Sequence, residues 1–289
     1  MKYYQPLIIM KKTIILLFAV LLSFSGVQAQ RHSDPWMFNH LSIGAGLGAI
    51  NGASIELALP ITPYLALRGG YNFFSNVKAK ERFDMVYYGN ARDYISHLPS
   101  RVELESKLDN SSAHVLLDIY PSCNSSFHFT TGAFFGNDDI IDVYNIDKYD
   151  AAALKEVYDF NNRLGAYSNV PADLGGQVGV MVDGTERIGV EVGDYLLEPN
   201  ANGTVKGNIK VKKFRPYLGI GFGRAVPMKY RMACTFDLGV QIWGKPEVYG
   251  SHHKLTNIGL DGKGDNLVQS ISKISVGPVI SVKLFGRIF

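Results

Sequence analysis

The stretch MACTFDLGVQI, from Met232 to Ile242, alternates apolar and polar residues from end to end. One set of alternate positions carries Met232, Cys234, Phe236, Leu238, Val240 and Ile242, and the other carries Thr235, Asp237, Gly239 and Gln241. Successive side chains of a β-strand point to opposite faces. The pattern therefore predicts a strand with one apolar and one polar face, and a strand of about 9–11 tilted residues can cross a membrane.

Seven further segments alternate in the same way: Leu41–Ala49, Ser54–Leu59, Leu65–Phe73, His114–Tyr120, Phe127–Gly136, Phe214–Gly223 and Ile274–Leu284. Opposite the apolar positions lie mainly Gly, Ser and Thr with isolated charges, which suit the narrow interior of a small barrel. We therefore predict an all-β fold, an antiparallel transmembrane β-barrel of eight strands. A soluble sandwich or lipocalin-like barrel is the alternative, with its apolar face inward and its polar face in water.

The connections between these segments fall into two classes. The connections at residues 60–63, 122–126 and 224–230 are short, whereas those at 78–100, 141–207 and 244–270 are long. The connection at Asn51-Gly52 lies on the same side as the long ones and is the one short exception there. Short periplasmic turns that alternate with long outer loops are typical of bacterial outer-membrane barrels. Within the loop at about 141–207, a helix is predicted over Asp150–Leu164 and a hairpin at Asp183-Gly184.

One segment leaves the strand count open. Val102, Leu104 and Leu108 are even-numbered, whereas the apolar residues of the following segment, Val115 and Leu117 among them, are odd-numbered. The apolar phase flips across Asp109–Ser112. A β-bulge within one long strand produces such a flip, and so does a turn, which would make ten strands the alternative count.

The N-terminus has the features of a secretory signal peptide. Lys11 and Lys12 precede the apolar run Ile14–Leu22, and Val27-Gln28-Ala29 forms a small-residue cleavage site. We expect residues 1–29 to be cleaved, with translation starting at Met1 or Met10, and residues 30–289 to form a single barrel domain. The cleaved segment carries three of the 29 Lys and Arg and none of the 26 Asp and Glu, so the net charge of +3 belongs to it. The mature chain therefore has no excess of Lys and Arg over Asp and Glu that would favour binding to nucleic acid.

Two pairs of strings carry a resemblance to a known family. FRPYLGIGFG at Phe214–Gly223, followed by FDLGV at Phe236–Val240, is similar to paired strands of OmpA/OmpW-like eight-stranded outer-membrane barrels. Val115–Pro121, with the following Phe127–Phe129, resembles the fourth and fifth strands of that family. The resemblance implies the fold and a location in the outer membrane of a Gram-negative bacterium, and it carries no shared catalytic residues. The chain also ends in Phe289, as many such barrels do, although Lys283 and Arg287 occupy positions that are usually apolar there.

The predicted inward face carries charges of both signs. They are Glu56, Arg68, Asp118, Arg215, Asp237 and Lys283, with His114 and His128 beside them. Buried charges must pair or bear a large desolvation cost, and the interior of eight strands is about wide enough for side chains to fill. We interpret this set as an interior network that plugs the barrel. The alternative is a narrow conducting or gated path.

Other motifs have ordinary explanations. Ser251-His252-His253 lacks the oriented base of a hydrolase and the third ligand of a zinc site. The strings Gly44–Gly48 and Gly219–Gly223 lack the helix and Lys of a phosphate loop, and Cys123 and Cys234 show no pattern that predicts pairing. We therefore expect no catalytic residues, no cofactor and no metal, and a protein that is not an enzyme.

The predicted function is a structural or surface-interaction role at the outer membrane. The expected partners are outer-membrane lipid and lipopolysaccharide, the outer-membrane assembly machinery, and a surface or envelope protein. A channel for small or apolar solutes is the alternative, and a lipid-modifying membrane enzyme is the third hypothesis.

Overall fold

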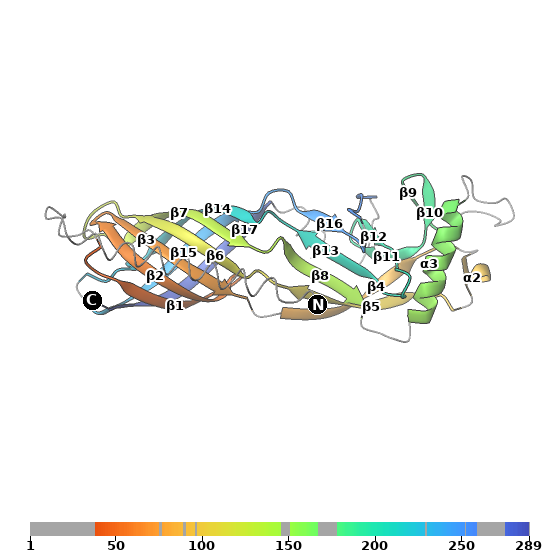
Figure 1. Cartoon of the computed structure of the whole chain (residues 1–289), viewed down its shortest axis with the longest axis horizontal. Helices are drawn as coiled ribbons and strands as arrows, with labels where there is room; N and C mark the ends of the chain where they lie inside the picture. The colour runs from red at the N-terminus through yellow and green to blue at the C-terminus, as the bar shows by residue number, and fades with distance from the viewer. Residues whose placement is uncertain are drawn as a thin grey trace, which may run out of the picture.

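The computed structural model describes residues 38–74, 77–88, 91–95, 97–145, 151–166, 178–228, 230–251, 253–258 and 275–288. The predicted signal peptide at 1–29 and the terminal Phe289 lie outside these residues. Within them, the chain forms two β-structures end to end, a closed barrel and an open sheet beyond one of its ends (Figure 1). The open sheet with its helices is called the extension below.

Eight described strands close the barrel, each antiparallel to its neighbours. They are β1 (Ser42–Gly48), β2 (Gly52–Thr62), β3 (Leu65–Phe73), β6 (Ser112–Ile119), β7 (Phe127–Gly136), β14 (Phe214–Phe222), β15 (Met232–Ile242) and β17 (Val276–Arg287). Their order around the wall follows the chain, and β17 closes on β1. The predicted all-β fold and the count of eight are confirmed, and each predicted segment coincides with one strand to within about two residues, except that β2 and β17 each run three residues beyond the predicted C-terminal end.

The extension holds the remaining elements. Its seven-stranded sheet consists of β4 (Val77–Val86), β5 (Arg101–Leu108), β8 (Asp139–Asn145), β11 (Gly189–Val192), β12 (Tyr195–Leu197), β13 (Lys206–Lys210) and β16 (Glu247–Tyr249). A hairpin of β9 (Val180–Val182) and β10 (Thr185–Arg187) turns at Asp183-Gly184, as predicted, and two helices complete it, α2 (Ala91–Tyr94) and α3 (Ala151–Ala166). Neither described helix is both long and apolar enough to cross a bilayer.

The sheet of the extension continues the barrel wall. Barrel strands β3, β6, β7, β14 and β15 are joined along the chain to β4, β5, β8, β13 and β16, and both sets lie in the same lateral order. Five neighbouring barrel strands are therefore each joined to a strand of a second sheet that lies beyond the end of the barrel, which gives the long body in Figure 1. The three long connections, which the sequence predicted as separate outer loops, form one folded unit. The single-domain boundary at 30–289 stays a prediction.

The phase flip at Asp109–Ser112 has a different cause from the two that the sequence left open. β5 and β6 belong to different sheets, and even-numbered residues are buried in both: Val102 and Leu104 in β5, His114 and Asp118 in β6. The even-numbered side is buried in both strands, but it is apolar in β5 and mainly polar in β6. The bulge and the additional hairpin, and with them the ten-strand barrel, are wrong.

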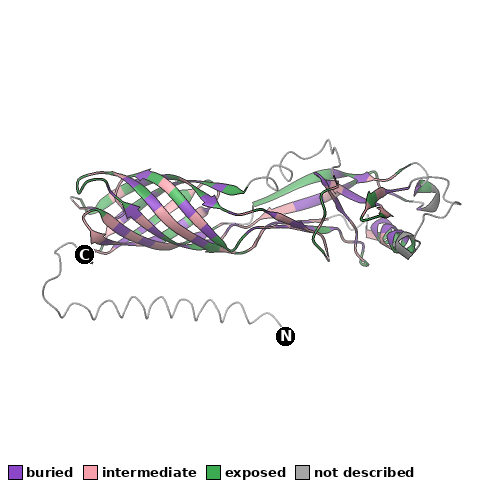
Figure 2. Ribbon diagram, turned by 90° about the horizontal axis from the view of Figure 1, so that it is seen from above, coloured by how far each residue is buried: buried purple, intermediate pink, exposed green. Residues whose placement is uncertain are grey.

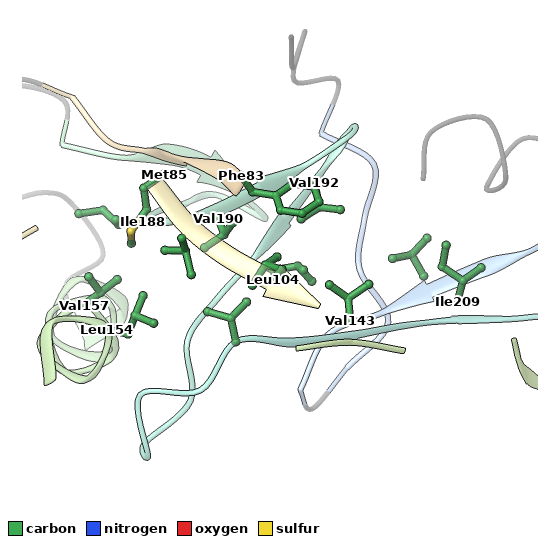
Figure 3. Close-up of a cluster of buried hydrophobic side chains, with 14 of the residues drawn as sticks. Phe83, Met85, Leu104, Val143, Leu154, Val157, Ile188, Val190, Val192 and Ile209 are labelled. Carbon is green, nitrogen blue, oxygen red and sulfur yellow. The ribbon is translucent and has the colours of Figure 1, made fainter. Parts of the chain in front are cut away.

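The apolar core of the molecule lies in the extension. Side chains from most of its strands and from α3 form one buried cluster. It includes Leu154 and Val157 of the helix, Leu104 and Val190 of the strands, and Ile188 between β10 and β11 (Figure 3). The predicted helix was therefore correct, and its apolar face is the face it buries. Deep burial of aliphatic side chains is what an ordinary water-soluble core requires.

The barrel has the opposite arrangement. Exposed and buried residues alternate along its strands, which gives the striped wall in Figure 2. In β15, for example, Phe236, Leu238 and Val240 are exposed, whereas Thr235, Asp237 and Gln241 are buried. The outer surface of the barrel is apolar and its interior is polar.

Candidate functional site: the barrel interior

Arg68 of β3 is the centre of the interior. Its side chain is fully buried and donates to both oxygens of Asp237, with Nη1–Oδ2 at 2.9 Å and Nη2–Oδ1 at 3.2 Å. It also donates to Asp118, with Nη2–Oδ1 at 2.8 Å, and its Nη1 lies 3.6 Å from Oε2 of Glu56. One guanidinium thus joins carboxylates from three other strands, β2, β6 and β15, which its planar fork of donors permits.

A second cation completes the pairing. Nζ of Lys283, on β17, lies 2.5 Å from Oε1 of Glu56 and 3.2 Å from Oδ2 of Asp237. Nε2 of His114 lies 2.9 Å from Oε1 of Glu56, and Nε2 of His128 lies 3.1 Å from Oδ1 of Asp237. These seven residues, Glu56, Arg68, His114, Asp118, His128, Asp237 and Lys283, are called the charge network below. Three carboxylates face two permanent cations, and each histidine lies within hydrogen-bond distance of one of those carboxylates.

Neighbouring hydroxyls and glycines shape the network. Thr130 donates to Oδ1 of Asp118 at 2.8 Å, and the Tyr120 hydroxyl donates to its Oδ2 at 3.4 Å. Gly70 and Gly221 leave room for the charged side chains, because a Cβ there would lie 2.7 Å from Cγ of Glu56 and 2.8 Å from Oδ1 of Asp237. Small residues on the inner wall are therefore what lets a narrow barrel contain this many charges.

The structure does not bring Arg215 into this group. It lies in a separate polar layer at the end of the barrel that meets the extension, where Nη1 donates to Oδ1 of Asn110 at 2.5 Å and Nε donates to the carbonyl of Lys212 at 2.9 Å. Asn110 and Gln241 both donate to Oδ1 of Asn51, at 3.3 and 3.2 Å. The alternation of β14 predicted that Arg215 faces the interior, but it did not predict its position along the barrel axis.

Apolar layers separate and close these polar ones. Leu116, Phe134, Tyr217 and Val279 form a buried cluster, with the rings of Phe134 and Tyr217 5.3 Å apart. Tyr120 and Phe285 belong to another cluster at the short-turn end, where Arg224 stacks 4.1 Å above the Tyr120 ring and donates to the carbonyls of Ser125 and Pro63. The cavity beside Glu56 and Lys283 measures about 10 Å³, room for about one water molecule. Among the described residues, side chains thus occupy most of the barrel interior beside the charge network.

The remaining candidate motifs lie elsewhere. Gly44–Gly48 falls in β1, and Gly219 to Gly221 in β14, so both are wall strands and not phosphate loops. Ser251 is half-buried and His253 exposed in the extension, and His252 lies outside the described residues. Cys123 and Cys234 are free and exposed. Among the described residues, no group of three or more His, Cys, Asp or Glu side chains is arranged to hold a metal ion.

Sequence reasoning missed the residues that support the charges. Thr130, Tyr120, Asn51, Asn110 and Gln241 all carry hydrogen bonds within the two polar layers. Gln241 and Thr130 were already on the predicted inward face, so their polarity was the available signal. Asn51 and Asn110 lie just outside strands, where alternation predicts no orientation.

The comparisons with known proteins found solved structures of low similarity. No protein-family model matches the chain, and no curated protein matches it. CarO2 from Acinetobacter baumannii is similar in structure with a TM-score of 0.42 and 18% identity, over 86% of this chain and 98% of CarO2. CarO from the same organism gives 0.42 and 15%, over 88% of this chain and 99% of CarO. The OmpA/OmpW-like family therefore stays a prediction.

Proposed function

We propose that this protein is an integral outer-membrane β-barrel of a Gram-negative bacterium. On this proposal the filled barrel is an anchor, and the extension, outside the cell, is the part that interacts with other surface molecules. The role is structural or interactive and not enzymatic.

The observation that carries the proposal is the absence of charge on the outer wall. Within the eight described barrel strands, Asp, Glu, Lys, Arg and His occur at nine positions, of which eight are buried inside: Glu56, Arg68, His114, Asp118, His128, Arg215, Asp237 and Lys283. The ninth, Arg287, is the last residue of β17. A water-facing wall would carry Lys and Glu. A lipid-facing wall excludes charges, because Lys or Arg costs about 2–4 kcal/mol at the midplane and Asp or Glu somewhat less.

Aromatic rings give the height of the apolar band. On the neighbouring strands β7 and β14, Phe135 pairs with Phe214 near the extension, and Phe127 pairs with Phe222 eight residues away. Phe135, Phe214 and Phe222 are exposed. The two ring pairs are about 27 Å apart along the strand, or roughly 21 Å along the barrel axis at the usual tilt, close to the apolar height of about 25 Å of such barrels.

The polar outer surface of the extension supports a role in binding other surface molecules. Along β4 and β5, Arg101 pairs with Asp84 at 2.7 Å and Arg82 with Glu103 at 3.5 Å, all in exposed or half-exposed positions. Its opposite face holds the apolar core. A folded unit with its own core and a polar exterior, joined to the barrel by five neighbouring chain segments, is suited to presenting a surface to a partner protein or to the lipopolysaccharide layer.

The first test is membrane fractionation of the native host, followed by electrophoresis of the extracted protein with and without boiling. We expect recovery with an outer-membrane marker protein and a mobility that changes on boiling, since a closed barrel resists detergent until heated. Recovery with a periplasmic marker, or a mobility unchanged by boiling, would refute the membrane barrel.

The second test separates the anchor from a channel. The filled lumen predicts that the purified protein, reconstituted into planar bilayers, gives no stable unitary conductance. A known porin reconstituted in parallel is the positive control. Reproducible conductance steps would replace the anchor with the solute channel that the sequence left as the alternative.

A further inference from the structure

A group of lysines lies where the barrel wall passes into the extension. Lys212 and Lys213 lie between β13 and β14, and Lys245 lies between β15 and β16, all three exposed. β14 and β15 are neighbours in the barrel, and the backbone N–H of Lys212 donates to the carbonyl of Trp243 at 3.1 Å, so the two segments lie side by side. The lysines therefore form one surface cluster.

The cluster borders the apolar band. Phe214 directly follows Lys213, and its ring lies 5.3 Å from that of Phe135. Both rings are about half exposed on the outer wall, 53% for Phe214 and 50% for Phe135. In the proposed orientation the lysines lie at the level of the lipid headgroups of the outer leaflet, and the two rings lie just below, at the level of the acyl chains.

The neighbouring carboxylates form ion pairs with lysines other than Lys212 and Lys245. Lys213 lies 3.7 Å from Asp138, Lys210 lies 3.5 Å from Asp139, and Lys254 lies 2.6 Å from Glu247. Lys212 and Lys245 form no ion pair with any residue in the described ranges. Within the described ranges, neither ammonium group thus has a carboxylate at ion-pair distance, although, after the hydrogen bond from Lys254, the charge of Lys245 contributes to lowering the pKa of Glu247.

The backbone holds the position of Lys212. Gly244 has a φ of +77°, and a Cβ there would lie 2.9 Å from both Cδ and Cε of Lys212. The methylene groups of Lys212 therefore pack against Gly244, which directly precedes Lys245. The ammonium groups of Lys212 and Lys245 are attached to adjacent, hydrogen-bonded backbone rather than to separate loops.

We propose that Lys212 and Lys245, with Phe135 and Phe214 below them, bind a phosphate group of lipopolysaccharide and the acyl chain next to it. Ammonium groups bind phosphate as point charges, and cations close to an anionic lipid surface strengthen attachment. This inference rests on the proposed membrane location and names the lipid contact of that same barrel.

The test is titration of the full mature chain, folded in detergent micelles, with bisphosphorylated lipid A, followed by native mass spectrometry. The double variant Lys212→Ser/Lys245→Ser should bind lipid A about tenfold more weakly. The matched control is Lys206→Ser/Lys155→Ser, which removes two exposed lysines of the extension farther from the band and should leave binding unchanged. Dephosphorylated lipid A should bind the unaltered protein as weakly as bisphosphorylated lipid A binds the double variant.

The other outcomes overturn the inference. Equal binding by the double variant, or an equal loss in the control, would mean that these two lysines are not the site. Displacement of lipid A by inorganic phosphate at equal concentration would mean that the cluster binds a soluble anion instead of a lipid. The boiling-dependent mobility shift of each variant is measured in parallel, so that a failure of the barrel itself is distinguished from a failure of the lipid site.

Discussion

Strands of the barrel and strands of the extension follow one another along the chain but place their apolar residues on opposite sides. From β5 to β6, the buried positions change from Val102 and Leu104 to His114 and Asp118, while the outer positions change from Arg101 and Glu103 to Val115 and Ile119. From β13 to β14, the outer positions change from Lys210 and Lys212 to Phe214 and Leu218. The buried side of the chain stays the same while its polarity reverses. On the proposed membrane location, this reversal marks the point where a strand leaves the lipid.

The polar interior of the barrel is where this contrast can be broken most severely. Arg68→Met removes one of two permanent cations, so that Glu56 and Asp237 keep only Lys283 and Asp118 loses its arginine partner. Loss of one partner of a buried ion pair typically costs about 3–5 kcal/mol, and we expect about 4 kcal/mol from urea unfolding of the protein in lipid vesicles. The boiling-dependent mobility shift should also appear at a lower temperature.

Arg215→Met is the control for this substitution. Arg215 is also a buried arginine of the barrel, but its described partners are carbonyl and amide oxygens rather than carboxylates. We expect a smaller loss than for Arg68→Met. A loss as large or larger would mean that the charge network is not what stabilises the barrel interior.

The outer wall gives the second prediction. Leu238→Arg places a cation mid-strand on the exposed side of β15, and it should cost about 3 kcal/mol in lipid because charge at the bilayer midplane costs about 2–4 kcal/mol. Met181→Arg, at an exposed position of the extension, should change stability by less than about 0.5 kcal/mol. Equal tolerance of the two substitutions would place both surfaces in the same solvent and refute the membrane boundary.

The apolar core of the extension gives the third prediction. Leu104→Ala empties space in the centre of the buried cluster and should destabilise the extension by about 2–3 kcal/mol. We expect faster cleavage of the extension by added protease at a temperature where the barrel still shows its mobility shift. Val77→Ala, at an exposed position of β4, is the control and should be cleaved like the unaltered protein. Loss of the barrel shift together with the extension would mean that the two regions unfold as one.

The contrast also explains how much the sequence could predict. Barrel strands such as β15 are long and alternate regularly, so period two alone gave their number, bounds and faces. The extension consists largely of strands of three to eight residues that pair across long intervals, as β8 does with β5 and with β13. Short strands give weak periodicity, and pairing between distant segments leaves no local signal.

The candidate site shows the same division. The alternation predicted that Glu56, Arg68 and Asp237 face inward, but it gives no height along the barrel axis. Height depends on strand register, which pairs Gly221 with Asp237 on β14 and β15 and thereby separates Arg215 from the network. Which inward charges meet is therefore a property of the closed barrel and not of any one strand.

The outer charges of the extension give the smallest expected effect. On the outer face of β4 and β5, Glu105 is covered by its neighbours: the ammonium of Lys78 lies 2.6 Å from its Oε1, and the Tyr144 hydroxyl donates to the same oxygen. The hydrogen bond from Lys78 and then that from Tyr144 hold the pKa of Glu105 below its ordinary value of about 4.5. A lowered pKa means that the folded state favours the carboxylate, so its contribution to stability is present above about pH 4.5 and is lost as the pH falls through the lower folded value.

We therefore expect protease cleavage of the extension to accelerate modestly between pH 7 and pH 3.5, measured with an acid-tolerant protease and corrected for its own pH profile. Glu105→Gln should raise cleavage at pH 7 and reduce the difference between the two pH values, because the group that titrates is gone. Glu81→Gln, an exposed position on the same strand pair, should keep the response of the unaltered protein. An unchanged response in Glu105→Gln would assign the acid sensitivity to other carboxylates. The polar side of the extension would then contribute solubility rather than stability, whereas the polar interior of the barrel contributes stability.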